Sequence, residues 1–212
     1  MSGFALPEGP LAVAAIGAHP DDIEIGCGGT LLSLGARAGT DIRSLVLTGT
    51  PEREREASAA ATAFGLAQEP RFRRLTDARL PSQWDEVKDG LHEFRDRIGQ
   101  PDIIFAPRPD DAHQDHALIG SLVRTVWRGP VILHYEIPKW DGDLGRPNAY
   151  VRLSDEVAHR KVALLNTSFP SQHGRDWWDD EFFLALMRLR GAECQSRYAE
   201  AFTTSKIVLG VS

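Results

Sequence analysis

Short apolar runs alternate with stretches of helical periodicity along most of the chain. The apolar runs, each bounded by polar or turn-forming residues, predict strands at 11–18, 42–47, 72–75, 103–106 and 131–135. Apolar residues at helical spacing predict helices at 28–38, 52–64, 84–98, 117–127, 154–166 and 177–190. Strands that alternate with helices predict an α/β fold, a single Rossmann-like doubly wound domain with a mostly parallel central sheet.

The segments between the predicted strands and helices show no domain boundary. Residues 139–148 (KWDGDLGRPN) are rich in Gly, Pro and Asp and predict a loop. Residues 197–203 are expected to end the ordered core. No repeat, low-complexity tract or linker interrupts the chain, so we expect one domain over residues 1–212.

Composition narrows the class of protein. A chain of 212 residues with 42% hydrophobic and 25% charged residues is typical of one globular domain. The net charge of -6 argues against a nucleic-acid binder, which normally carries a basic excess. Cys27 and Cys194 form no CxxC pair, which predicts a reducing compartment and no thiolate zinc site. We expect a cytoplasmic protein without a secretory signal or a transmembrane segment.

A cluster of titratable residues follows the first predicted strand, in the motif AHPDD at 18–22. In open α/β sheets, ligands bind beyond the carboxyl ends of the strands. Imidazole and carboxylate groups bind zinc, so His19 and Asp22 could supply two ligands and leave Asp21 beside the metal as a base. The alternative is that Asp21 or Asp22 only caps the following helix.

Three glycines follow this motif, at Gly26, Gly28 and Gly29. A dinucleotide-binding fingerprint would need a further glycine at position 31, which is Leu31. We therefore expect these glycines to let the backbone turn tightly into the next helix.

A second motif, HQDH at 113–116, follows the predicted strand at 103–106. Because both strands are predicted to be parallel, the two motifs should emerge at the same edge of the sheet. His116 could then complete a His–Asp–His metal site, with His113 as a further imidazole near the metal. Asp115 could orient an imidazole by accepting its other N–H. An HxxH pair alone is weak evidence, since surface histidines are common, but one shared metal explains both motifs.

AHPDD with a later HxDH on this strand pattern resembles the PIG-L/LmbE-like zinc-dependent N-acetylglucosamine deacetylase family. Gln114 stands where the family usually has Pro, at a position that is not a ligand. The resemblance extends to the stretch 198–202 and to Glu24, Gly26, Gly28, Gly29, Arg53, Glu56, Ser171 and Gln172.

The resemblance implies an activity and a set of roles. Family members hydrolyse the N-acetyl group of glucosamine-containing conjugates, and relatives cleave other amides. His19, Asp22 and His116 match the family's ligands for one Zn²⁺, with Fe²⁺ as an alternative metal. Asp21 matches the general base, and His113 matches the histidine that stabilises the oxyanion. Family members are often oligomeric, so a homo-oligomer is possible, and the sequence leaves the oligomeric state open.

From these residues we expect zinc to activate a water, Asp21 to take its proton, and a protonated His113, held by Asp115, to stabilise the charge on the carbonyl oxygen. Arg53 is a candidate contact to sugar hydroxyls or a phosphate; otherwise it is a solvated helix charge. Trp140 could stack on a sugar ring, although an ordinary loop is the simpler interpretation.

Three alternatives remain at this point. A zinc amidase could use the same centre on a non-sugar or non-acetyl amide. A nucleotide-binding α/β module would lack hydrolytic chemistry, and the incomplete glycine pattern argues against it. A binding domain without catalysis is disfavoured by the full set of His and Asp residues.

Overall fold

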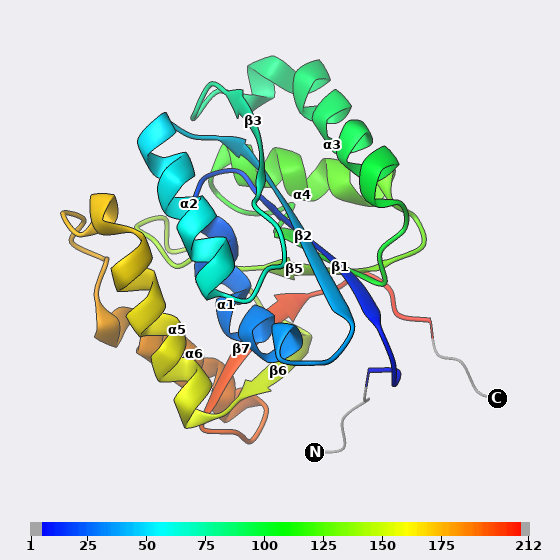
Figure 1. The fold of residues 1–212 in the computed structure, drawn as a ribbon. Helices are drawn as coiled ribbons and strands as arrows, with labels where there is room; N and C mark the ends of the chain where they lie inside the picture. Colours follow the sequence, from blue (N-terminus) through cyan, green and yellow to red (C-terminus); the bar gives the residue numbers. More distant parts are fainter. Residues whose placement is uncertain (1–5, 209–212) are drawn as a thin grey trace.

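The computed structural model describes residues 6–208, which form one mixed sheet with helices on both faces (Figure 1). Seven strands of this part of the chain lie in the order β3-β2-β1-β4-β5-β7-β6, and β7 runs antiparallel to the other six. The predicted α/β fold with a mostly parallel sheet is confirmed. The strands are β1 (Leu11–Gly17), β2 (Thr40–Thr48), β3 (Arg71–Leu75), β4 (Ile103–Pro107), β5 (Val131–Tyr135), β6 (Ala149–Leu153) and β7 (Tyr198–Thr203).

Two hydrophobic cores lie on the two faces of the sheet. One core is closed by α3 and α4, and the other by α1, α2, α5 and α6 (Figure 1). Val87, Leu91 and Phe94 form the buried face of α3, as the helical spacing predicts. The helices are α1 (Asp22–Gly35), α2 (Pro51–Ala63), α3 (Trp84–Ile98), α4 (Gln114–Val126), α5 (Asp155–Ser168) and α6 (Asp180–Glu193), with short 3₁₀ turns η1 (Leu80–Gln83) and η2 (Pro170–Gln172).

Helix α1 begins at Asp22, earlier than predicted, so the three glycines lie inside the helix and do not turn the chain into it. A side chain at Gly26 would place its Cβ 2.3 Å from the ring of Tyr135, and one at Gly28 would lie 2.6 Å from Phe64. The glycines therefore flank a break inside α1, at Cys27, and do not form a turn in front of it. These residues are small because other elements pack directly on the helix backbone.

Helix α1 is also broken at Cys27, where φ is -143° and ψ is 16°. A buried ion pair binds the backbone groups that the break releases. Lys161 Nζ donates to the Ile25 carbonyl at 2.6 Å and lies 2.7 Å from Glu200 Oε1. Glu200 Oε2 accepts the Thr30 N–H at 2.7 Å. The pair thus caps both halves of the helix and fixes the angle of the half that carries Asp22.

The end of the chain contains two strands that the apolar pattern did not predict. Strand β6 lies at the edge of the sheet, where its half-exposed residues give a weak signal. Strand β7 falls within 197–203 and is almost entirely buried between β5 and β6.

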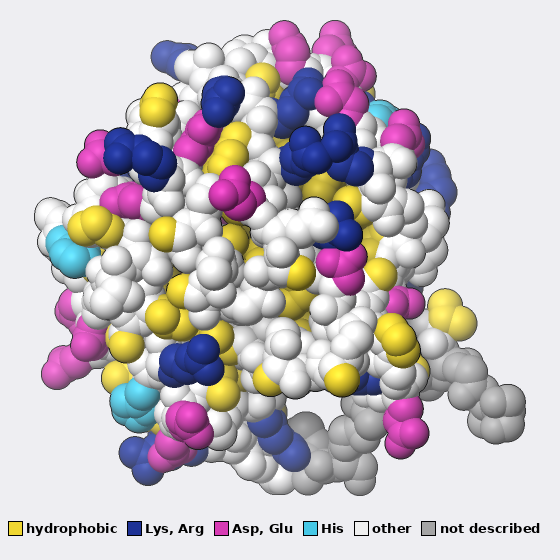
Figure 2. Space-filling view, in the orientation of Figure 1, with side chains coloured by type: hydrophobic (Ala, Val, Ile, Leu, Met, Phe, Trp, Pro, Cys, Tyr) yellow, Lys and Arg dark blue, Asp and Glu magenta, His cyan; other side chains and the backbone are white. Residues whose placement is uncertain are grey.

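Two further observations concern membrane-spanning helices and the distribution of charge on the surface. Within residues 6–208, no helix is both long enough and apolar enough to cross a bilayer. On the face seen in Figure 2, Lys and Arg side chains are mixed with Asp and Glu side chains.

Candidate active site

The sheet topology brings the two sequence motifs together. Strands β1 and β4 are parallel neighbours. The chain leaves β1 toward β2 and β3 on one side, and returns to β4 on the other. This is the switch in strand order beside which open α/β sheets bind ligands. Residues 18–22 follow β1, and residues 113–116 lie beyond β4 at the start of α4.

The side chain of Asp22 folds the loop after β1 tightly. Asp22 Oδ2 accepts the N–H groups of Ala18 at 2.9 Å and His19 at 2.8 Å. Asp21 precedes α1 with φ of +120°, a strained value for a residue other than glycine. Its side chain makes no capping bond to the helix, so the interpretation of Asp21 as a simple helix cap is not supported.

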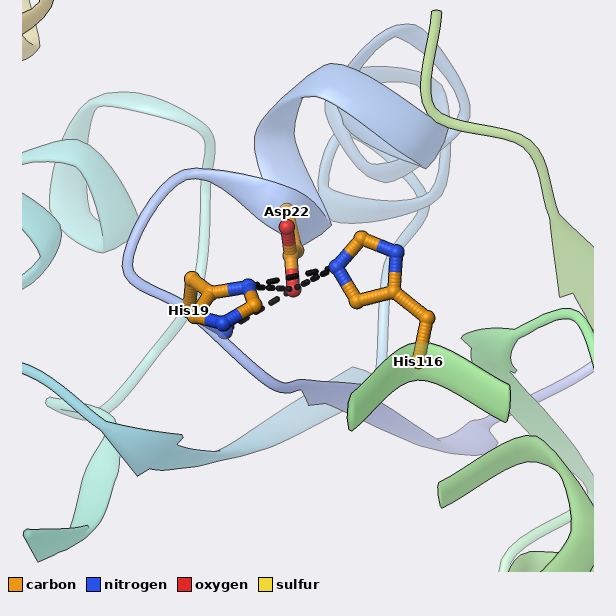
Figure 3. Close-up of side chains that lie close together, drawn as sticks. All are labelled: His19, Asp22 and His116. Carbon is orange, nitrogen blue, oxygen red and sulfur yellow. Dashed lines mark hydrogen bonds and ion pairs between the residues drawn. The ribbon is translucent and has the colours of Figure 1, made fainter. Parts of the chain in front are cut away.

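His19, Asp22 and His116 point toward one another from the loop after β1, the start of α1 and the first turn of α4 (Figure 3). His116 Nε2 lies 3.2 Å from both His19 Nδ1 and Asp22 Oδ2, and His19 Nδ1 lies 3.5 Å from Asp22 Oδ2. Zinc bonds of about 2.0–2.1 Å at tetrahedral angles place neighbouring ligand atoms about 3.3 Å apart. These three atoms therefore form a His–His–Asp set that can hold a divalent metal ion.

Carboxylates surround the far sides of both imidazoles. His116 Nδ1 faces Asp111 Oδ2 at 3.2 Å, and His19 Nε2 faces Asp115 Oδ2 at 3.4 Å and Asp77 Oδ1 at 3.0 Å. Such outer carboxylates orient metal-binding imidazoles and raise their basicity. Our sequence interpretation did not include Asp77 and Asp111. Both lie just beyond strand ends at the same edge, β3 and β4, which is the signal that could have identified them.

His113 and Asp115 interact differently from the sequence-based expectation. The Asp115 carboxylate lies at His19, and His113 receives only the Asp115 backbone N–H, at Nδ1 and 3.3 Å. A ring that accepts at Nδ1 carries its proton at Nε2 and is neutral. Burial lowers the pKa of His113, and the neighbouring His116 and His19 lower it further. The Asp115 carboxylate therefore lies closer to hydrogen-bonding His19 than His113, and the surroundings of His113 favour its neutral form.

Asp21 and Arg53 form an ion pair next to the cluster of His19, Asp22 and His116. Arg53 Nη2 donates to Asp21 Oδ2 at 2.7 Å and also contacts the Pro20 carbonyl. Burial raises the pKa of Asp21 to about 7, against the opposing charge of Arg53. Arg53 lines the same cavity, so it reaches the place expected of a substrate contact, but one of its nitrogens already holds Asp21.

These residues line one wall of a cavity of about 290 Å³ that is open to solvent. This volume lies near the lower end of the range of small-molecule sites, about 300–1,000 Å³. The opposite wall comes from the β5–β6 and α5–α6 connections and includes Lys139, Trp140, Gln172, Arg175 and Trp177. Such a cavity, with convergent imidazoles and a buried carboxylate at the strand ends of an α/β sheet, is the type of site found in hydrolytic enzymes.

Comparison with known proteins also indicates a hydrolytic enzyme and identifies its family. The model of the PIG-L family, described as GlcNAc-PI de-N-acetylase, matches residues 14–127. An uncharacterized deacetylase of Escherichia coli (strain K12), YaiS, is 31% identical over 169 residues, which cover 72% of this chain and 88% of that protein.

Solved structures show the same fold. A conserved protein from Thermus thermophilus, TT1542, superposes with a TM-score of 0.76 at 27% identity, over 95% of this chain and 97% of the other. N,N'-diacetylchitobiose deacetylase from Pyrococcus horikoshii has a TM-score of 0.72 at 23% identity, over 92% and 83% of the two chains. The teicoplanin deacetylase Orf2 has a TM-score of 0.66 at 14% identity, over 92% and 99%.

This chain belongs to the PIG-L family and is a deacetylase. The segment matched by the family model contains His19, Asp22 and His116, together with Asp21 and Arg53. It ends before the β5–β6 and α5–α6 connections, so the opposite wall of the cavity lies outside the matched segment.

Proposed function

We propose that the protein hydrolyses the N-acetyl group of an amino sugar, or of an amino-sugar conjugate, with one Zn²⁺ held by His19, Asp22 and His116. The observation that carries this proposal is the 3.2–3.5 Å spacing of the three ligand atoms, in a cavity that Asp21 also lines. The products are acetate and a free amine.

When bound, the ion would polarise the amide carbonyl as a Lewis acid and lower the pKa of the attacking water. Asp21 is the proposed base. It takes the proton of that water and later returns it to the leaving nitrogen, so one carboxylate serves as base and then acid. Arg53 holds Oδ2 of Asp21 at 2.7 Å and fixes the orientation of the carboxylate, so the proton is proposed to move through Oδ1.

His113 is the proposed donor to the developing oxyanion. Its Nδ1 is occupied by the Asp115 backbone N–H, which leaves an Nε2–H to donate. A fixed neutral donor stabilises negative charge that develops in the transition state without needing to be protonated. The ring lies 4.9 Å from that of His19 and 4.8 Å from that of His116, close enough to serve the same reacting group. The proposed role of Asp115 is to orient His19.

Acetate release tests the proposal. Protein stripped of metal and reloaded with one equivalent of Zn²⁺ is incubated with N-acetylglucosamine and a panel of its glycosides, and acetate is measured. We expect release that depends on the metal. A parallel reload with Fe²⁺ under anaerobic conditions compares the two metals. Stoichiometric zinc binding without acetate from any member of the panel would contradict the sugar substrate and favour an amidase with another acyl group or scaffold.

A further inference from the structure

We propose that Trp140 is a stacking platform for a second sugar ring, joined to the N-acetylated ring that occupies the metal side of the cavity. This inference rests on the proposed function for the position of the first ring. It assigns the wall opposite the metal-binding residues a role in recognising amino-sugar conjugates with at least two rings.

Trp140 is exposed yet held in place. Its side chain is 64% exposed and lines the cavity. The indole N–H donates to Asp176 Oδ1 at 2.9 Å, and the ring packs edge to face with Trp177 at a centroid distance of 5.9 Å. Arg175 lies over the ring with its Cζ 5.9 Å from the centroid. An isolated exposed apolar side chain is ordinary, but one fixed by three residues of another connection is preorganised.

The preceding residue anchors the loop from inside. Lys139 is partly buried, and its Nζ donates to Asp111 Oδ1 at 3.0 Å and to Asp143 Oδ1 at 3.4 Å. The other oxygen of Asp111 faces His116 at 3.2 Å. Trp140 is therefore tied, through one residue, to the outer carboxylate of the metal-binding set.

The connection that holds Trp140 is itself tied to helix α2. Glu56 accepts the backbone N–H of Ser171 at 2.9 Å and its hydroxyl at 2.6 Å. Gln172 then donates to Ser171 Oγ at 3.0 Å and accepts from Arg175 Nε at 2.6 Å. Glu56 lies on the same helix as Arg53, which holds Asp21. One helix thus positions both the base and the support of Trp140, which fixes the distance between the two parts of the cavity.

The surroundings of Trp140 favour a sugar over an acyl chain. An indole face suits the apolar C–H face of a pyranose, and its polar neighbours suit hydroxyl groups at the ring edge. Asp141 and Arg175 line the same cavity and supply a carboxylate acceptor and guanidinium donors. An acyl chain has no polar groups with which to use these further acceptors and donors. Because these contacts already hold the indole in place, we expect little ordering when the ring stacks.

The test compares binding of two probes to the zinc-loaded protein, N-acetylglucosamine and N,N'-diacetylchitobiose, by calorimetry under conditions where turnover is slow. We expect the disaccharide to bind more tightly, and Trp140→Ala to reduce the ratio of the two affinities about tenfold. Trp140→Phe keeps an aromatic face and should restore most of the ratio. Trp84→Ala removes another exposed tryptophan, at the start of α3 and outside the cavity, and should leave the ratio unchanged.

The outcomes separate the two proposals. Acetate release with an affinity ratio that Trp140→Ala does not change would overturn the platform and leave the deacetylase proposal standing. A ratio that depends on Trp140 without acetate release would support the platform and contradict N-acetyl hydrolysis. An octyl glycoside of N-acetylglucosamine serves as the third probe. If Trp140→Ala weakens that glycoside more than the disaccharide, or if neither sugar binds at millimolar concentration, the second-ring assignment is wrong.

Discussion

The two walls of the cavity are built by different means. The metal side consists of two short motifs, at 18–22 and 113–116, placed by the ends of β1 and β4. The opposite wall consists of two connections, β5–β6 and α5–α6, held by side-chain contacts. Examples are the bond from Trp140 to Asp176 at 2.9 Å and the bond from Lys139 to Asp111 at 3.0 Å. Sheet geometry therefore positions the proposed chemistry, and contacts between loops position the proposed recognition.

Because of this difference, the positions of residues in the two walls depend on different contacts. A residue that follows directly after a parallel strand in the chain keeps its position as long as the sheet forms, because the hydrogen-bond register fixes the ends of the strands. A loop residue keeps its position only while its particular partners remain. Asp111 joins the two walls, since one of its oxygens faces His116 and the other binds Lys139.

Removing a proposed ligand should have the largest effect on the metal side. We expect His116→Ala to lose stoichiometric zinc and acetate release together, with zinc affinity reduced more than about 100-fold, beyond the loss seen when an outer residue is changed. Elemental analysis after dialysis measures the metal. His92→Ala, on α3 and outside the cavity, is the matched control. Full zinc occupancy in His116→Ala would remove this residue from the ligand set.

Changing the proposed base should separate metal binding from turnover. Asp21→Asn keeps the shape of the side chain and does not touch the three ligand atoms, so we expect normal zinc content and a fall in kcat of about 10²–10⁴-fold. Steady-state acetate release together with metal analysis measures both quantities. Near-normal turnover in Asp21→Asn would assign the base to another residue.

The buried pair of Glu200 and Lys161 is expected to stabilise the helix that carries Asp22. Glu200→Gln leaves Lys161 buried without its counter-charge, and breaking a buried ion pair in this way costs about 3–5 kcal/mol of folding stability. Chemical denaturation of the metal-free protein measures this change. Glu69→Gln, at an exposed loop position, is the control and should change the stability by less than about 0.5 kcal/mol. Equal stability of the two variants would mean that the pair does not support the break in α1.

The smallest expected effect is at the junction of the two walls. Asp111→Asn removes the charge that faces His116 and Lys139, and outer residues of this kind change metal affinity by about 10–100-fold. Competition with a chelator of known zinc affinity measures the change. Asp110→Asn alters the neighbouring exposed carboxylate, which binds Arg108 at 3.0 Å, and should leave zinc affinity as it is. If both variants bind zinc equally, the two walls are energetically independent.

The sequence was sufficient for the α/β class and for the residues that gather at the sheet edge. Apolar runs of strand length alternate with helical spacing, and titratable residues follow the first and fourth strands. Those signals are local, and the rule that parallel strand ends share one edge converts them into a site. Periodicity was weaker at the end of the chain, where β6 lies at the sheet edge and exposes much of its surface.

Only the tertiary structure decided which groups meet. Asp22 belongs to the same helix as Gly26 and Gly28, whose missing side chains admit Tyr135 and Phe64, and no local pattern distinguishes such packing from a turn. The Asp115 carboxylate faces His19, and His113 receives the Asp115 backbone N–H, although the place of Asp115 in the HQDH motif suggested a side-chain partner within the motif. The reason is that these contacts join residues far apart in the chain, so their distances are fixed by how the sheet, helices and loops pack.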